Sequence, residues 1–328
     1  MSDNVWKRPT DGGLLRYVNR NTISEFGVLI AILLLIIGFS FASPFFFTVS
    51  NFANIGRQTT LLAITSFAMT FVILSGEIDI SIGAIASLSG VVIALLLREQ
   101  FPMLLAILAG LAVGGLAGLL NGLITVKGKI PSFIVTLGTL SVIQGAALAM
   151  TNASTIVFSN DLYRDLFARA SLFGIPAPVI FAVVLFFVLN WLLTSTRFGS
   201  NIYAVGGGAA TARLAGIPVD RVKIQVFTLS GMLTAMASLV LTARVGNGQP
   251  LGAQGLELDA IAAVVLGGTS FLGGRGALWR TVLGALLIGV LNNGLTLVSI
   301  AYYPQLLVKG GIIILAVYID SLTRGQKS

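Results

Sequence analysis

The chain has 328 residues, of which 56% are hydrophobic and only 10% are charged, with a net charge of +8. A soluble domain carries about 25% charged residues, so the composition predicts an all-α protein embedded in a membrane and surrounded by lipid. Cysteine and histidine are both absent, which excludes disulfides, thiolate or imidazole metal sites and catalysis by a nucleophile–histidine pair. We therefore expect no catalytic residue and no metal site. We also expect no nucleic-acid partner, because the basic residues are scattered through loops.

The chain contains ten apolar segments that approach the roughly 20 residues of a membrane-spanning helix. The segment at 258–272 is short and is interrupted by glycines, which indicates a half-helix that other parts of the protein must cover. We predict about ten helices in one transmembrane domain over 1–328. The ten segments are 25–43, 58–75, 80–97, 103–126, 131–150, 177–195, 223–243, 258–272, 277–298 and 302–319.

The basic residues orient these segments in the membrane. If the N-terminus lies in the cytoplasm, most of the 20 lysines and arginines fall in cytoplasmic loops, as the positive-inside rule requires. Residues 1–24 then form a cytoplasmic N-terminal segment, and the C-terminus is cytoplasmic as well. The largest outside loop is 151–176, and 244–257 is a second outside loop.

A weak internal repeat relates two parts of the chain, about 58–150 and about 223–319. These halves lie five segments apart, and an odd offset reverses their direction, which is typical of inverted-topology repeats. The alternative is chance similarity between glycine- and leucine-rich spans. The matching elements are Glu77-Ile78-Asp79 with Glu257-Leu258-Asp259, and Asn121-Gly122-Leu123 with Asn293-Gly294-Leu295.

A polar, basic stretch at 196–223 separates the two halves. Within it, Ala209 to Leu214 is predicted to form a short helix, because glycines precede it and Gly216 and Pro218 would end it. A compact helix in the largest basic cytoplasmic loop indicates contact with a soluble partner.

Several polar residues lie within or beside the apolar segments, where an unpaired polar group is costly. Amides there either bond neighbouring helices together or line a polar pathway, and Glu77 and Asp79 either close a turn or face a polar cavity. Lys309 would pair with an acid or extend toward the membrane surface. The candidate pathway residues are Glu77, Asp79, Asn121, Thr136, Gln144, Thr269, Ser270 and Asn293.

Four glycines recur at every fourth position of the segment at 103–126 and so share one helical face. Such a stripe lets two helices approach closely, either within the subunit or at a dimer contact. A phosphate-binding G-x-x-x-x-G-K-[ST] motif is absent from the sequence, so any ATP chemistry belongs to another chain. The four glycines are Gly110, Gly114, Gly118 and Gly122.

Three stretches make the sequence resemble the permease subunits of bacterial ABC sugar importers, in the ribose-permease group, over nearly the whole chain. They are MTFVILSGEIDISIGA (69–84), YAVGGGAATARLAGIPVDRVKI (203–224) and LELDAIAAVVLGGTSFLGGRGALWRTVLGALLIGVLNNGL (256–295). The resemblance implies an inner-membrane protein with ten helices and inverted halves, like the vitamin B12 importer. It also implies a second permease copy, identical or related, together with ATPase subunits that carry ATP and magnesium, and a periplasmic sugar-binding protein. We expect no cofactor on this chain.

In such importers a cytoplasmic coupling helix docks into a cleft of the ATPase. Two departures from the family pattern stand out: Ala209 occupies a position that is usually Glu, and Glu77 replaces the second glycine of a G-G-I-D-L-S motif. The residues that match the coupling helix are Gly207, Gly208, Ala209, Ala210, Thr211, Arg213, Leu214 and Gly216.

Two other functions remain open at this point. An ion-coupled secondary transporter would use Glu77, Asp79 and Lys309, and it also fits inverted repeats. Branched-chain amino-acid permeases belong to the same superfamily as the sugar permeases. A membrane enzyme is disfavoured, because histidine and cysteine are absent and acidic residues are few.

Overall fold

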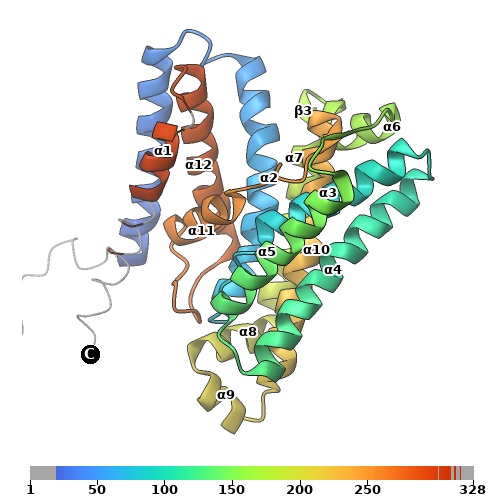
Figure 1. The fold of residues 1–328 in the computed structure, drawn as a ribbon. Helices are drawn as coiled ribbons and strands as arrows, with labels where there is room; N and C mark the ends of the chain where they lie inside the picture. Colours follow the sequence, from blue (N-terminus) through green and yellow to red (C-terminus); the bar gives the residue numbers. More distant parts are fainter. Residues whose placement is uncertain (1–19, 302, 312–313, 315–317, 319–328) are drawn as a thin grey trace, which may run out of the picture.

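The computed structural model describes residues 20–301, 303–311, 314 and 318, and these residues are mainly helical (Figure 1). Most of the expected N-terminal segment and seven of the 18 residues of the last expected span lie outside the described residues. Residues 303–311 of that span are helical. The long helices are α1 (Arg20–Ala42), α2 (Val49–Leu74), α3 (Ile82–Arg98), α4 (Met103–Gly128), α5 (Ser132–Thr151), α7 (Ala177–Ser195), α10 (Val219–Val245) and α12 (Leu278–Leu297). The shorter ones are α6 (Asp161–Arg164), the π-helix η2 (Asp165–Arg169), α8 (Arg197–Gly207), α9 (Ala209–Leu214) and α11 (Leu256–Leu266).

Most predicted boundaries lie within five residues of the helix ends, and two differ by more. Helix α2 begins at Val49 rather than 58, because Thr48 caps it and accepts a hydrogen bond from the backbone N–H of Asn51 at 3.3 Å. Helix α11 ends at Leu266 rather than 272, where Gly267 and then Gly268, at a φ of +86°, end the helix.

The number of helices that can span a membrane is smaller than expected in the part of the chain that the structure describes. Six helices there are long and apolar enough: α2, α4, α5, α7, α10 and α12. Helix α3 and the Gly27–Ala42 part of α1 are apolar but shorter. At about 1.5 Å per residue, α11 is far shorter than the roughly 30 Å of a bilayer core, as expected for a half-helix.

Helix α10 lies at the centre of the bundle, against α4, α2 and α3. The predicted glycine stripe forms its contact with α4: a methyl group added at Gly122 would lie 2.8 Å from the Cα of Ile224, and one at Gly114 would lie 2.6 Å from Ala235 Cβ. Gly110, one turn earlier, faces Ile93 of α3 instead. The stripe therefore packs helices within the subunit, which was one of its two expected uses.

The two ends of the bundle carry different structures (Figure 1). At one end, which we call the α9 end, α8 and α9 project beyond the long helices. At the opposite end, the α6 end, lie the α1–α2 connection, α6 and η2, together with two short antiparallel ribbons. These ribbons correct the purely α-helical expectation. They pair β1 (Ile156–Val157) with β4 (Asn247–Gly248) and β2 (Ser171–Leu172) with β3 (Ile175–Pro176).

The β1–β4 ribbon joins the two predicted outside loops, 151–176 and 244–257. The first of these is also fixed to the bundle by Tyr163, whose hydroxyl donates to Leu239 O at 3.1 Å and lies 2.6 Å from Thr242 Oγ1. The second does not stay outside. After β4 it runs back along α3, and the Ala253 N–H donates to Ser87 Oγ at 3.1 Å.

Candidate functional site

Helices α8 and α9 form a helical hairpin at the α9 end. Thr196 caps α8 by accepting from the Gly199 N–H at 3.3 Å, and Gly208 separates the two helices. Helix α9 has the predicted bounds, Ala209–Leu214. The turn after it contains Gly216, whose φ of +79° favours glycine, and the Ile217 N–H closes this turn on Ala212 O at 3.0 Å.

Helix α9 presents most of its side chains to the outside. Leu214 is 91% exposed at the tip of the hairpin, an unusual place for a large apolar residue. Arg213 is exposed beside it and holds Asp220 at 2.6 Å, while Ala212 is buried against the bundle. Ala209 is half-buried. Other members of the predicted coupling set, Gly207, Ala210, Thr211 and Gly216, are exposed as well, and Gly208 is half-buried.

Three segments where helices end meet directly behind this hairpin, and their glycines allow the backbones to touch. An added methyl at Gly206 would overlap the carbonyl oxygen of Leu74 and lie 2.6 Å from the backbone nitrogen of Gly274. The Gly274 N–H donates to Leu74 O at 2.9 Å. An added methyl at Gly273 would lie 2.8 Å from Gly76. We call this contact of the 75–81 turn, the end of α8 and the 267–277 loop the glycine junction.

Two polar contacts reinforce the glycine junction. Glu77, in the turn between α2 and α3, forms an ion pair with Lys223 in the second turn of α10. Tyr203 of α8 donates its hydroxyl hydrogen to Gly276 O at 2.9 Å. Burial raises the pKa of Tyr203, so its hydroxyl keeps the proton that this bond needs. These contacts fix the hairpin to the 75–81 turn in the first half of the sequence and to the 267–277 loop in the second half.

Asp79 closes the turn that begins α3. Its Oδ1 accepts hydrogen bonds from the backbone N–H of Ser81 at 3.0 Å and from Ser81 Oγ at 2.6 Å. Asn121 of α4 donates to the same serine oxygen at 2.8 Å. Thr136 of α5 bonds Ser132 O at 2.9 Å, and Ser132 Oγ accepts from the Ile78 N–H at 3.1 Å. Four of the predicted pathway residues, Glu77, Asp79, Asn121 and Thr136, therefore gather around one turn.

The other predicted pathway residues lie elsewhere. Asn293 exchanges two amide hydrogen bonds of 3.0 Å with Asn51, which ties α12 to α2. Thr269 and Ser270 are buried in the 267–277 loop, and Gln144 is half-buried on α5. The amides of Asn121 and Asn293 thus bond helices together. A role of any of these residues in a translocation pathway stays a prediction.

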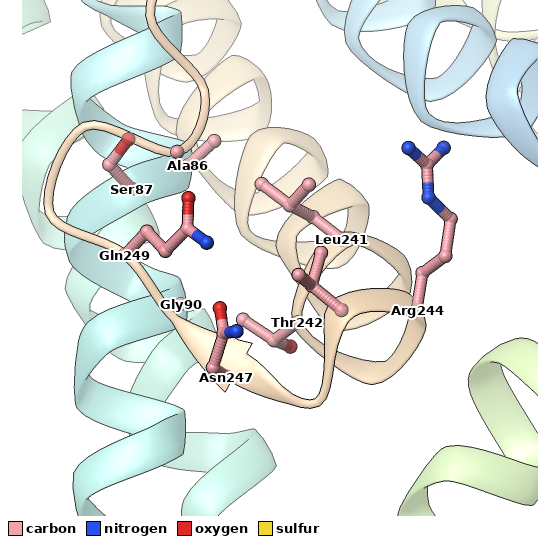
Figure 2. A pocket seen from close by; sticks show the side chains of 10 residues that line it. Ala86, Ser87, Gly90, Leu241, Thr242, Arg244, Asn247 and Gln249 are labelled. Carbon is pink, nitrogen blue, oxygen red and sulfur yellow. The ribbon is translucent and has the colours of Figure 1, made fainter. Parts of the chain in front are cut away.

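Sequence reasoning missed a cavity of about 160 Å³ at the α6 end, which we call the polar cavity because five of its ten lining residues carry polar side chains. Its walls are α3, the last turns of α10 and the segment at 246–255, and Figure 2 shows the amide groups of Asn247 and Gln249 projecting from that segment. The signal in the sequence was the polar run Asn247-Gly248-Gln249-Pro250, which we interpreted as part of an outside loop.

A second cavity, of about 270 Å³, has almost only apolar walls and lies between α2, α7 and α12.

Comparisons with known proteins identify the class of this bundle. Residues 51–317 match the family described as "Branched-chain amino acid transport system / permease component". The chain belongs to this permease family. The permease is 41% identical over 309 residues to the ribose import permease protein RbsC of Escherichia coli (strain K12), covering 93% of this chain and 96% of that protein.

Two further relatives give the same result. The permease is 42% identical over 299 residues to the ribose import permease protein RbsC of Bacillus subtilis (strain 168), covering 91% of this chain and 93% of that protein. It is 40% identical over 296 residues to the D-allose transport system permease protein AlsC of Escherichia coli (strain K12), covering 90% of both chains. A comparison with the solved structures finds no match. The family and the apolar helices together make the permease a multi-pass membrane protein.

Proposed function

We propose that this chain is the membrane permease subunit of an ABC importer that carries a monosaccharide of the ribose type across the bacterial inner membrane. ATP and magnesium bind to a separate ATPase subunit, and a periplasmic binding protein delivers the sugar. A second permease copy, identical or related, completes the membrane part. The observation that carries this proposal is the likeness to ribose import permeases along nine-tenths of the chain.

The orientation and the finer fold follow from the same proposal. The α9 end faces the cytoplasm together with both chain termini, and the α6 end faces the periplasm. Ten membrane helices form two inverted halves, about 58–150 and about 223–319. This is supported by the directions of α4 and α12, which carry the two Asn-Gly-Leu copies: α4 runs toward the α9 end and α12 runs away from it (Figure 1).

Helix α9 serves as the coupling helix in this proposal. Its exposed Leu214 inserts into an apolar cleft of the ATPase, and the neighbouring Arg213 contacts the rim. Because Ala209 offers no carboxylate, the contact rests on shape and on these two side chains. The glycine junction transmits the motion of α9 to the turns at 75–81 and 267–277, so that the helices can change between outward- and inward-facing arrangements.

Two of the three charged residues that would serve an ion-coupled transporter are already paired, and the third, Asp79, accepts hydrogen bonds from Ser81. Glu77 is paired with Lys223, and Lys309 lies 2.9 Å from Asp259. A group that takes up and releases ions during transport has to exchange partners, so two formed ion pairs favour a structural role. The family description instead supports a second substrate class, branched-chain amino acids.

Uptake into proteoliposomes tests the proposal. The permease is reconstituted with the ATPase and the binding protein of its own system, and uptake of D-ribose, D-allose and leucine is measured with and without ATP inside. We expect uptake of a sugar that requires both ATP and the binding protein. Uptake of leucine alone, or uptake driven by an ion gradient without ATP, would overturn it.

Leu214→Ala tests the role of α9. The side chain is 91% exposed, so its truncation should leave the fold intact, whereas the loss of an interface anchor of about 1.4 kcal/mol or more lowers ATPase binding tenfold or more. Leu120→Ala is the matched control, because Leu120 is 55% exposed on α4, away from the hairpin. Equal ATPase co-purification with both variants would exclude α9 as the docking element.

A further inference from the structure

We propose that the polar cavity at the α6 end is a binding site of the permease itself for a neutral, polyhydroxylated molecule of the size of a monosaccharide. The site would receive the sugar after it leaves the binding protein. This inference rests on the function proposed above and adds a location, a ligand chemistry and named residues. The cavity lies apart from the residues that the sequence suggested for the pathway.

The cavity exists because the chain after α10 does not remain outside the bundle. An added methyl at Gly248 would lie 2.6 Å from Ala94 Cβ, and further along the segment Ala253 bonds Ser87, about two turns nearer to the start of α3. The segment is non-helical here, and such a backbone is tolerated at membrane depth only where protein buries it or where it lines a water-filled space. One of its sides packs on α3, and its amide side chains border the cavity.

The two amide side chains that border the cavity are not used by the fold, whereas Thr242 on its wall already bonds Tyr163 and Ser238. The Oδ1 atom of Asn247 is buried and has no hydrogen-bond partner among the described residues. The Gln249 side chain likewise makes no hydrogen bond with any residue that the structure describes, and Ser87 Oγ only accepts one there, from Ala253. A buried polar atom without a partner costs about 1–3 kcal/mol, so a rotation of the Asn247 amide toward a ligand in the cavity would gain a hydrogen bond. The Gln249 side chain is exposed and can bond a ligand directly.

The chemistry of these groups fits hydroxyl groups. Each amide offers both a donor and an acceptor, and so does each hydroxyl group of a sugar. None of the residues that line the cavity is acidic, so the ammonium group of an amino acid would find no counter-charge. Arg244 also borders the cavity, but its guanidinium points away from the two amides in Figure 2. The amide pair therefore favours a neutral ligand over a zwitterion.

The size of the cavity agrees with a monosaccharide. A water takes about 30 Å³ in the liquid, so 160 Å³ corresponds to roughly five waters, which is enough space for a small hydroxylated ring. The larger cavity between α2, α7 and α12 does not suit a sugar, because its walls are almost entirely apolar. A hydroxylated ligand would lose its water hydrogen bonds there without replacement.

Ligand-detected NMR tests the site on the full permease. The protein is placed in lipid nanodiscs without the binding protein, and saturation transfer to D-ribose is measured over a concentration series, with leucine as the contrasting probe. We expect saturable transfer to D-ribose and none to leucine. In Asn247→Ala/Gln249→Ala the dissociation constant should rise at least tenfold, which corresponds to about 1.4 kcal/mol.

Gln254→Ala is the matched control, because Gln254 is an exposed amide of the same segment that does not line the cavity. Equal binding by the control and the double variant would overturn the site, as would the absence of saturable transfer in the unmodified permease. Gln249→Ala alone serves if the double variant does not fold, with ATPase co-purification through α9 as the check on folding. If importers that carry the double variant or the control take up sugar at the unchanged rate, the site is refuted and the proposed function remains intact. If the unmodified importer takes up no sugar, the proposed function itself is refuted.

Discussion

The two Glu-x-Asp segments of this permease share a sequence pattern and have different neighbours. In the first, Glu77 forms the ion pair, with Lys223, and Asp79 closes a turn by accepting two hydrogen bonds from Ser81. In the second the roles are exchanged: Asp259 forms the ion pair, with Lys309, and Glu257 accepts a hydrogen bond from the Gly255 N–H at 3.2 Å. The same spacing of carboxylates thus serves two different local structures.

The surroundings explain the exchange. The first segment lies in the glycine junction, where Gly76 touches the 267–277 loop. A methyl group added at Gly76 would lie 3.7 Å from the Cα of Gly206. The second segment opens α11, directly after the chain that borders the polar cavity. One region is packed tightly and fixes α9, while the other leaves polar groups unused. We infer that the first region transmits motion and the second contacts a transient ligand.

The largest effect is expected from Gly206→Ala, which breaks the tight region. The new methyl would overlap the carbonyl oxygen of Leu74 and approach Gly274 N to 2.6 Å, and both of these are backbone atoms that cannot move alone. We expect a loss of about 3 kcal/mol or more in the free energy of unfolding, measured by denaturant unfolding in detergent. Gly207→Ala is the control, since nothing lies within 4 Å of its added methyl. If both variants lost the same free energy of unfolding, the glycine junction would not be close-packed.

A smaller effect is expected from Lys309→Met, which disturbs the second segment. The substitution leaves Asp259 charged, and among the described residues only the Asn292 side chain then donates a hydrogen bond to its carboxylate, at 3.3 Å. Breaking a fully buried pair costs about 3–5 kcal/mol, and since Lys309 is 15% exposed we expect about 2–3 kcal/mol. The double variant Asp259→Asn/Lys309→Met removes the unpaired charge and should recover most of the loss. If the double variant is as unstable as the single one, the ion pair does not explain the stability of this region.

The boundaries of several elements followed from the sequence because local signals determined them. Helix α9 has the predicted bounds, since glycines stand on both sides of it. Helix α7 has them too, since Pro176 precedes it and the polar Thr196 follows. The short α11 also agreed with the expected half-helix, because the glycines at 267 and 268 end it locally.

Two features could not be predicted because distant contacts determine them. Helix α8 contains three glycines, which disfavour a helix, and it forms because Ile202 and Val205 are buried in the core and Gly206 must approach Leu74. The return of the segment at 246–255 into the bundle depends on β1 and on Ser87 of α3, which are far away in the sequence. The composition of that segment is equally suited to a loop in water.

The smallest of the three effects is expected from the ion pair of the first segment. Glu77→Gln keeps the shape of the side chain and removes its charge. Because Lys223 is 22% exposed, water replaces part of the lost interaction, and we expect a cost of about 1–2 kcal/mol. The exchanged pair Glu77→Lys/Lys223→Glu should regain much of this stability. Lys127 is an exposed lysine at the same end of the bundle, so Lys127→Glu should change the free energy of unfolding by less than about 0.5 kcal/mol.

The ATPase rate of the assembled importer gives the second measurement: if the pair transmits motion from α9, the exchanged variant recovers coupling as well as stability. Recovery of stability without coupling would mean that Glu77 only holds the turn closed.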